Sequence, residues 1–189
     1  MDEDIQLMLK VKAGDRQAFN VIVDKYSREI INYAYRFTGI KEDAEDIGQE
    51  VFVRVFNAAP GYTASAKFTT WLYRIAYNAC VDYIRKRKHG GKVSSLDAVE
   101  GETEIQVPDP NNKPADELML DAEESAGIRA ALSLLPEKQR AALILKVYED
   151  KSYAEIAEIL GVSVASVESM IFRARTAMRQ VLKKTEKNN

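Results

Sequence analysis

Hydrophobic residues recur every three or four positions over residues 5–88, which is the period of amphipathic helices rather than strands. The pattern is interrupted at Gly14, Gly39 and Pro60-Gly61. We therefore expect helices over residues 5–13, 17–37, 41–56 and 68–88, with a loop of small and turn-forming residues over 57–66.

The pattern changes between Gly90-Gly91 and Pro114, where three of the five prolines fall and the periodicity is lost. Helical periodicity then returns over residues 115–135, 137–149, 153–160 and 164–184. The expected fold is all-α, with a four-helix domain over residues 1–92 and a second small helical domain over residues 114–189. A flexible acidic linker over residues 93–113 joins them.

The charge distribution adds a functional question. Among the 189 residues, 46% are hydrophobic and 30% are charged, which is typical of a globular chain and argues against wholesale disorder. Residues 1–92 carry a net charge of +3, residues 93–127 of −9 and residues 128–189 of +4. Two basic blocks around an acidic connector raise the possibility of nucleic acid at both ends, with a merely solvated surface as the alternative.

The sequence also bears on the cellular compartment. Cys80 is the only cysteine, so the chain forms no internal disulfide. No apolar run approaches the about 18 residues of a membrane span, and the first residues are acidic rather than signal-like. We expect a cytoplasmic protein without membrane insertion, in which Cys80 is a packing residue beside the apolar arc of its helix rather than a redox sensor.

A helix-turn-helix is indicated near the carboxy terminus. Ser152 and Glu155 have the spacing of a capping box, which marks a helix start. The small residue Ala157, the turn residue Gly161 and the apolar Val167 follow at the spacing of two helices that cross steeply. The second helix, capped by Ser163, would present outward Ala165, Ser166, Ser169 and either Phe172 or Arg173.

A basic stripe follows this motif. Arg175, Arg179 and Lys183 lie four residues apart on one face, so the helix can meet phosphates along its length. The alternative is an ordinary helical hairpin whose last helix ends in solvated basic residues. The motif and the stripe together favour DNA.

The helix over residues 68–88 has two distinct faces. Its predicted buried arc consists of Phe68, Leu72, Ile75, Ala79 and Tyr83. A second arc combines aromatic, cationic and amide side chains, a mixture suited to stacking on bases and holding phosphates: Trp71, Arg74, Asn78 and Arg85. The basic residues 85–88 extend this arc. Alternatively, Trp71 borders the core and the arginines are only solvated.

The helix over residues 41–56 is acidic, with Ile47, Val51, Phe52 and Val55 on its apolar side. Its acids would repel DNA, so a protein partner is the better interpretation, although acids also stabilise the first turn of a helix. The polar cluster consists of Glu42, Asp43, Glu45, Asp46, Gln49 and Glu50.

Two other classes of protein deserve comparison. A metal-dependent phosphotransferase could use the acids at 42–46, but adjacent acids do not converge on one ion, His89 is the only histidine, and no glycine-rich phosphate loop is present. We therefore expect no enzyme activity, no metal and no cofactor. A helix-turn-helix repressor acting alone would need a dimer and a palindromic site, and it would leave the acidic helix unused.

Four segments resemble the bacterial extracytoplasmic-function sigma factors, the smallest class of promoter-recognition subunits of RNA polymerase. The resemblance covers nearly the whole chain outside the linker. The segments are residues 43–52 (DAEDIGQEVF), 67–78 (KFTTWLYRIAYN), 135–140 (LPEKQR) and 152–161 (SYAEIAEILG).

The resemblance implies a transcription initiation factor that binds core RNA polymerase, including its beta-prime and beta subunits, and directs it to promoters. The acidic helix would dock on the polymerase clamp helices through Asp46, Gln49, Glu50 and Phe52. The loop and the next helix would recognise and melt the minus-10 element, with Tyr62 and Asn78 forming a pocket for an extruded base. Bordering the melted strands would be Trp71, Arg74 and Arg85.

The resemblance further implies that the helix-turn-helix reads the minus-35 element. The residues in that role would be Ala165, Ser166, Ser169, Arg173, Arg175 and Arg179. The chain departs from the usual family pattern at Ala165, Ser166, Glu168 and Met170, which leaves the minus-35 preference open. The acidic linker would thread through the polymerase, and a cognate anti-sigma factor, often membrane-bound, is the further partner implied.

Overall fold

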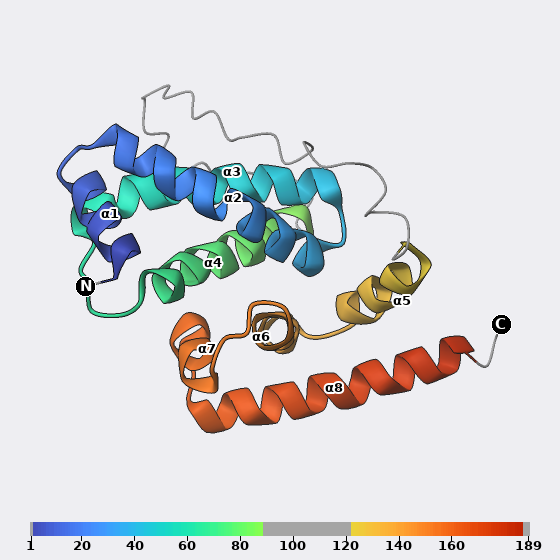
Figure 1. Cartoon of the computed structure of the whole chain (residues 1–189). Helices are drawn as coiled ribbons and strands as arrows, with labels where there is room; N and C mark the ends of the chain where they lie inside the picture. The colour runs from blue at the N-terminus through green and yellow to red at the C-terminus, as the bar shows by residue number, and fades with distance from the viewer. Residues whose placement is uncertain (1, 89–121, 187–189) are drawn as a thin grey trace.

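The computed structural model describes residues 2–88 and 122–186, and all the regular structure within these ranges is helical (Figure 1). The predicted linker, residues 93–113, and the start of the predicted fifth helix lie outside the described residues. The elements are α1 (Glu3–Lys12), α2 (Arg16–Thr38), α3 (Lys41–Ala58), the 3₁₀ turn η1 (Ala59–Gly61), α4 (Phe68–Lys88), α5 (Ala122–Ser133), α6 (Glu137–Val147), α7 (Tyr153–Leu160) and α8 (Val164–Glu186).

Capping side chains and glycines mark the helix ends; the sequence predicted Ser152, Glu155, Gly39 and Gly161, but not Asp15. The Asp15 carboxylate accepts hydrogen bonds from two backbone amides at the start of α2, at 2.9 and 3.1 Å. Ser152 and Glu155 form the reciprocal capping box that begins α7. Gly39 (φ 79°) and Gly161 (φ 63°) end α2 and α7 in the left-handed region, which is least costly for glycine.

The amino-terminal domain is built around α2, which packs against α1, α3 and α4. Gly48 lets α3 approach α2 closely, because a Cβ atom at this position would lie only 2.6 Å from the Cγ1 atom of Ile31. In the carboxy-terminal domain, α8 packs against α5, α6 and α7 (Figure 1). None of the helices described here combines the length and the apolar character needed to cross a bilayer.

The two domains are in direct contact. Helix α4 lies against α7, and α2 lies against α5 and α6, so the hydrophobic cluster runs without interruption through both domains. Helix α4 is consequently buried on more than the predicted arc. Phe68, Leu72 and Ala79 are buried as expected, but Tyr73 and Tyr77 are buried as well.

The remaining members of the predicted arc of α4, Ile75 and Tyr83, are only half-buried. Cys80 is fully buried, and burial raises the pKa of its thiol far above the ordinary value. A buried, protonated thiol is a poor nucleophile, so Cys80 acts as a packing residue, in agreement with the sequence.

Candidate nucleic-acid interface

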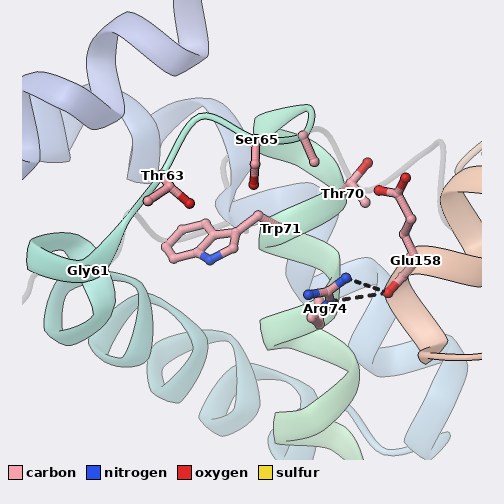
Figure 2. Close-up of a pocket in the computed structure, with 8 residues that line it drawn as sticks. Gly61, Thr63, Ser65, Thr70, Trp71, Arg74 and Glu158 are labelled. Carbon is pink, nitrogen blue, oxygen red and sulfur yellow. Dashed lines mark hydrogen bonds between the residues drawn. The ribbon is translucent and has the colours of Figure 1, made fainter.

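A cavity of about 380 Å³ lies between the loop after η1 and the first turns of α4 (Figure 2). Trp71 and Arg74, two members of the second arc of α4 that the sequence predicted to contact nucleic acid, both line this cavity. The cavity is therefore bordered by an indole and a guanidinium, beside the hydroxyl groups of the loop. The other lining residues are Gly61, Thr63, Ser65, Ala66, Thr70 and Glu158.

The indole of Trp71 is held by two aromatic neighbours. Its ring meets the Tyr62 ring edge-on, with centroids 5.0 Å apart, and lies 6.0 Å from the Phe68 ring. Trp71 is half-buried, so part of its surface remains available beside the cavity. Both interpretations of Trp71 therefore hold in part. Its ring borders the core, and it also lies beside the polar groups of the second arc of α4.

The structure does not bring Tyr62 and Asn78 together into the predicted pocket. Tyr62 is only 2% exposed beneath Trp71, whereas Asn78 is exposed on α4, and neither lines the cavity. The physical reason is the aromatic packing of Tyr62 against Phe68 and Trp71. Burial raises the pKa of the Tyr62 hydroxyl, which has no hydrogen-bond partner among the described residues.

The carboxy-terminal domain reaches the same site, which the sequence did not predict. Arg74 donates from Nε and Nη2 to the backbone carbonyl oxygen of Glu158 on α7, at 3.1 and 2.7 Å (Figure 2). At the start of α4, the Lys67 ammonium lies 2.9 Å from the Glu155 carboxylate. Helix α7 therefore forms one wall of the cavity.

The basic end of α4 is exposed and largely paired with acids. Arg87 donates to Asp43 on α3 at 2.5 Å, and Arg85 lies 3.6 Å from Asp82 within α4. Exposed pairs of this kind are weak and exchange readily with other anions. The predicted DNA-facing role of Arg85 is therefore compatible with its position, although part of the positive charge is neutralised here.

The predicted polymerase-binding helix presents its acidic side chains as expected, with one exception. Asp46, Gln49 and Glu50 are exposed on α3, and Glu50 accepts a hydrogen bond from Arg54 Nε at 2.7 Å. Phe52 is completely buried, so its assignment to the contact surface is wrong for this structure. It lies on the core side of α3 and can act only by supporting the helix.

Val53, which the sequence interpretation omitted, is 38% exposed on α3 next to the same polar cluster. An exposed valine beside acidic residues adds an apolar contact to the candidate surface. The signal was present in the sequence, because Val53 follows Gln49 by four residues and Glu50 by three, the spacing of one helical face.

In the helix-turn-helix, the predicted DNA-reading side chains lie on the outer face of α8. Ala165, Ser169, Arg173, Arg175 and Arg179 are exposed, while Ser166 is half-buried and its amide donates to the Ser163 hydroxyl at 3.2 Å. The residues of this set up to Arg173 line a cavity of about 380 Å³, whereas Arg175 and Arg179 do not. Its lining consists of Pro136, Lys138, Gln139, Ala165, Ser166, Ser169, Met170 and Arg173.

Lys138 and Gln139 come from the first turn of α6 and were missed by the sequence interpretation. They reach the recognition helix because α6 packs directly against α8. Phe172 is 73% exposed on α8, which resolves the choice left open between Phe172 and Arg173, since both side chains face solvent.

Comparison with known proteins identifies both halves of the chain. Residues 22–90 match the family model of Sigma-70 region 2, and residues 125–178 match that of Sigma-70 region 4. The fold and the surfaces described above thus define a two-domain initiation factor of the sigma-70 type.

Full-length relatives narrow this class. The ECF RNA polymerase sigma factor SigW of Bacillus subtilis is 35% identical over 185 residues, which make up 95% of this chain and 99% of that protein. The ECF RNA polymerase sigma-E factor of Escherichia coli K12 is 33% identical over 181 residues, covering 93% of this chain and 92% of that protein. The chain belongs to the extracytoplasmic-function (ECF) sigma factors of the sigma-70 family.

Solved structures show the same fold. The structure of CnrH in complex with the cytosolic domain of CnrY superposes with a TM-score of 0.71 at 24% identity, covering 97% of this chain and 99% of that chain. The sigma factor RpoE from Bartonella quintana, solved with the anti-sigma factor NepR, gives a TM-score of 0.61 at 24% identity, covering 87% and 96%. The protein is accordingly a promoter-specific transcription initiation factor that binds RNA polymerase, and not an enzyme.

Proposed function

We propose that separate surfaces of this sigma factor divide the work of initiation. Residues 1–92 bind core polymerase through α3 and engage the minus-10 element through the η1–α4 loop and α4. Residues 114–189 read the minus-35 element through α8, and residues 93–113 connect the two domains within the polymerase.

The observation that carries this proposal is the cavity between the loop and α4. It combines an aromatic face at Trp71, a cation at Arg74 and loop hydroxyl groups, which are the groups that hold an unstacked base and its phosphate. Trp71 and Arg74 are placed on one face by their spacing of three residues on α4. This site is suited to a melted strand rather than to an intact duplex.

Tyr62 belongs to this proposal despite its burial. A buried hydroxyl without a partner costs about 1–3 kcal/mol relative to one that is hydrogen-bonded. Rotation of the Tyr62 ring in the promoter complex would give this hydroxyl a partner, in exchange for its packing against Phe68 and Trp71. We therefore retain Tyr62 and Asn78 as minus-10 contacts in the promoter complex.

The polymerase contact is assigned to the exposed face of α3. Asp46 and Glu50 supply negative charge, Gln49 supplies a neutral amide, and Val53 supplies an apolar centre. A surface of this composition suits a basic, partly apolar protein partner such as the clamp helices of the beta-prime subunit.

The minus-35 contact is assigned to the outer face of α8. Ala165, Ser166 and Ser169 are small enough to approach base edges, the two serines with a hydroxyl group and Ala165 with a methyl group, and Arg173 can donate to a guanine or a phosphate. Further along the helix, Arg175 and Arg179 are exposed and suited to the backbone.

The relatives suggest the setting in which the protein works. RpoE of Bartonella quintana was solved with an anti-sigma factor, and we propose a cognate anti-sigma factor for this chain as well. We place the protein in the bacterial cytoplasm, where RNA polymerase acts, and the factor requires no metal or cofactor for promoter recognition.

The minus-10 assignment is tested in a reconstituted system of core polymerase, the full chain and a promoter selected by genome-wide binding. Trp71→Ala and Arg74→Ala should each reduce permanganate reactivity of the minus-10 thymines by about tenfold, because base stacking on Trp71 contributes about 1–3 kcal/mol and a hydrogen bond from a charged group such as Arg74 contributes about 1.5–3 kcal/mol. Core binding, followed by gel filtration, should stay unchanged.

Arg28→Ala is the matched control, because Arg28 is an exposed arginine of α2 away from the cavity. Full melting by both cavity variants would refute the assignment of this site. Loss of melting in the control as well would show that the effect is one of overall charge.

A further inference from the structure

The outer face of α8 carries two side chains that the proposed minus-35 contact leaves without a role. Glu168 and Phe172 are both exposed, and Phe172 is 73% exposed. Among the side chains that the structure describes, none forms an ion pair with the Glu168 carboxylate, and no other aromatic ring packs on Phe172. Neither residue contributes to the core, so the packing of the domain does not require this acid or this ring.

The rotation of α8 about its own axis is fixed by its buried residues. Val167, Ile171 and Ala174 are all buried and face α5, α6 and α7. Figure 1 shows α8 along one edge of the molecule, with these three helices on one side of it. At about 100° per residue, four exposed positions lie on the half of α8 that faces away from the core. They are Ala165, Glu168, Ser169 and Phe172.

An open hollow of about 430 Å³ lies on this outer face, and its lining consists of Glu168, Ser169, Phe172 and Arg173. Ser169 and Arg173 also line the cavity between α6 and α8, so the two hollows adjoin one another. The surface assigned to the minus-35 element therefore continues over Glu168 and Phe172. It adds a hydrogen-bond acceptor and an apolar ring to the serines and the arginine.

The carboxylate of Glu168 has one well-matched partner among the base edges of the major groove. An acid on a DNA-binding face repels the phosphates of every duplex and so lowers the affinity for all sequences. The cytosine N4 amino group is a donor that a carboxylate can accept from. Guanine and thymine present only acceptors to a carboxylate, and adenine places an acceptor beside its donor. Glu168 therefore favours a cytosine over the other three bases.

The ring of Phe172 also has one matching group in the major groove. The methyl group of thymine is the apolar group that distinguishes this base there, and an aromatic side chain can pack on it. Four residues of α8 span about 6 Å, whereas one base step spans about 3.4 Å. The bases that meet Glu168 and Phe172 should therefore lie within about two base pairs of each other.

We propose that Glu168 and Phe172 set the base preference of the minus-35 contact. The Glu168 carboxylate accepts a hydrogen bond from the N4 amino group of a cytosine. The Phe172 ring packs on the methyl group of a thymine within about two base pairs of that cytosine. This inference rests on the proposed role of α8 at the minus-35 element, and the experiments below separate the failure of one from the failure of the other.

The preference is measured with the holoenzyme assembled from core polymerase and the full chain. The DNA is a library with a randomised minus-35 segment and a fixed minus-10 element, taken from a promoter selected by genome-wide binding, and bound templates are sequenced. The parent should enrich a C·G pair and a nearby T·A pair, each about fivefold or more over the alternatives. Glu168→Ala should remove the preference at the C·G pair alone. Glu168→Gln should shift it toward adenine, to which an amide binds bidentately.

The charge of Glu168 gives a second readout of opposite sign. Glu168→Ala should raise binding to duplexes that lack the element by about twofold, because the repulsion of phosphates is gone. Arg175→Gln, on the same helix, is the matched control and should weaken binding to all templates without changing the base preference. An equal gain on every template from Glu168→Ala would show that the acid is only solvated, and would overturn its role.

The contact of Phe172 is tested by replacing the preferred thymine with deoxyuridine, which removes only the methyl group. This replacement should weaken binding by the parent about fivefold and should not affect Phe172→Ala. Equal losses in the parent and the variant would overturn the contact. Phe172→Ala should also retain the helical circular dichroism of the parent and its binding to core polymerase. Loss of polymerase binding would assign the ring to a protein contact and refute the proposal.

The base preference and the minus-35 function can fail independently. If Arg173→Ala changes the preferred minus-35 sequence but the Glu168 and Phe172 variants do not, α8 reads the element and the present proposal is wrong. If the parent shows no preference in the randomised segment and Arg173→Ala and Arg175→Gln bind as the parent does, the proposed minus-35 function of α8 is itself wrong.

Discussion

Lys12 donates a hydrogen bond from its ammonium to the backbone carbonyl oxygen of Tyr62, at 2.8 Å. The bond joins the last residue of α1 to the loop that borders the cavity, and α1 also packs against η1. The amino-terminal helix therefore contributes to the position of the loop without lining the cavity itself.

Lys12→Met should consequently weaken promoter melting while leaving polymerase binding intact. Methionine retains the length of the side chain but removes the donor, and a hydrogen bond from a charged group contributes about 1.5–3 kcal/mol. Because Lys12 is largely exposed, we expect an effect near the lower limit, about tenfold in permanganate reactivity. Lys10→Met, at an exposed position of the same helix, is the control, and an equal loss in both variants would contradict a specific role for Lys12.

Gly48→Ala should destabilise the amino-terminal domain. Alanine improves helix propensity by about 1 kcal/mol over glycine. However, the added Cβ would lie 2.6 Å from Ile31 Cγ1, and overpacking of a core costs about 1–3 kcal/mol. We therefore expect a net loss of about 1 kcal/mol in the free energy of unfolding, measured by urea denaturation.

Gly127→Ala provides the opposite case within the same protein. Gly127 lies in α5, and a Cβ atom there would meet nothing within 4 Å. Only the propensity gain should remain, about 0.5–1 kcal/mol of added stability. If both alanine variants change stability in the same direction, the close approach of α3 to α2 does not determine the residue at position 48.

Asp46→Lys should weaken binding to core polymerase by tenfold or more, since reversing a charge at a complementary surface creates repulsion where attraction existed. The side chain is exposed on α3, so folding should change by no more than about 0.5 kcal/mol. Asp46 gives a cleaner test than Glu50, whose replacement would also remove the partner of Arg54. Undiminished co-elution with core polymerase would refute the assignment of α3, and Asp24→Lys controls for net charge.

The carboxyl group of Glu155 should titrate with a pKa of about 2. The Ser152 hydroxyl, the Lys67 ammonium and the Ser152 amide all donate to this carboxylate and so lower the pKa from the ordinary value of 4.5. Because the folded-state pKa is depressed, the associated stabilisation is complete above about pH 4.5 and is lost as the pH falls toward 2. Carbon-13 NMR titration of the side chain measures this directly.

Lys67→Met separates the contribution of the other domain to this pKa. It should raise the pKa of Glu155, but not to the ordinary value, because both Ser152 donors remain within the capping box. A pKa unchanged by the substitution would show that the Lys67–Glu155 pair is not formed in solution.

The sequence predicted most of the helical architecture because helix ends depend on local chemistry. Ser152, Glu155 and Gly161 are close in sequence, and their side-chain or backbone preferences alone mark the bounds of α7. The start of α4 at Phe68 followed from the end of the loop of small and turn-forming residues over 57–66 and the return of helical periodicity. The start of the fifth helix lies outside the described residues and stays a prediction.

The functional surfaces were harder to predict because they depend on contacts between distant segments. Tyr73 and Tyr77 lie off the predicted apolar arc of α4, and they are buried because the carboxy-terminal domain and α2 pack there. The resemblance assigned Phe52 to the contact with core polymerase, but its side chain is buried in the core. Lys138 entered the candidate minus-35 surface only through the packing of α6 on α8.

The domain contact mixes bonds to main-chain oxygens with bonds between side chains, and this difference bears on how readily the halves of related factors can be exchanged. Arg140 and Arg74 donate to carbonyl oxygens, which any residue at the accepting position provides. The Tyr73–Glu149 and Lys67–Glu155 pairs instead require matching side chains on both halves. A chimaera that joins this carboxy-terminal half to the amino-terminal half of a distant relative would retain the main-chain bonds and lose the side-chain pairs. Its halves would be held together more loosely than either parent's, whatever promoter each half prefers.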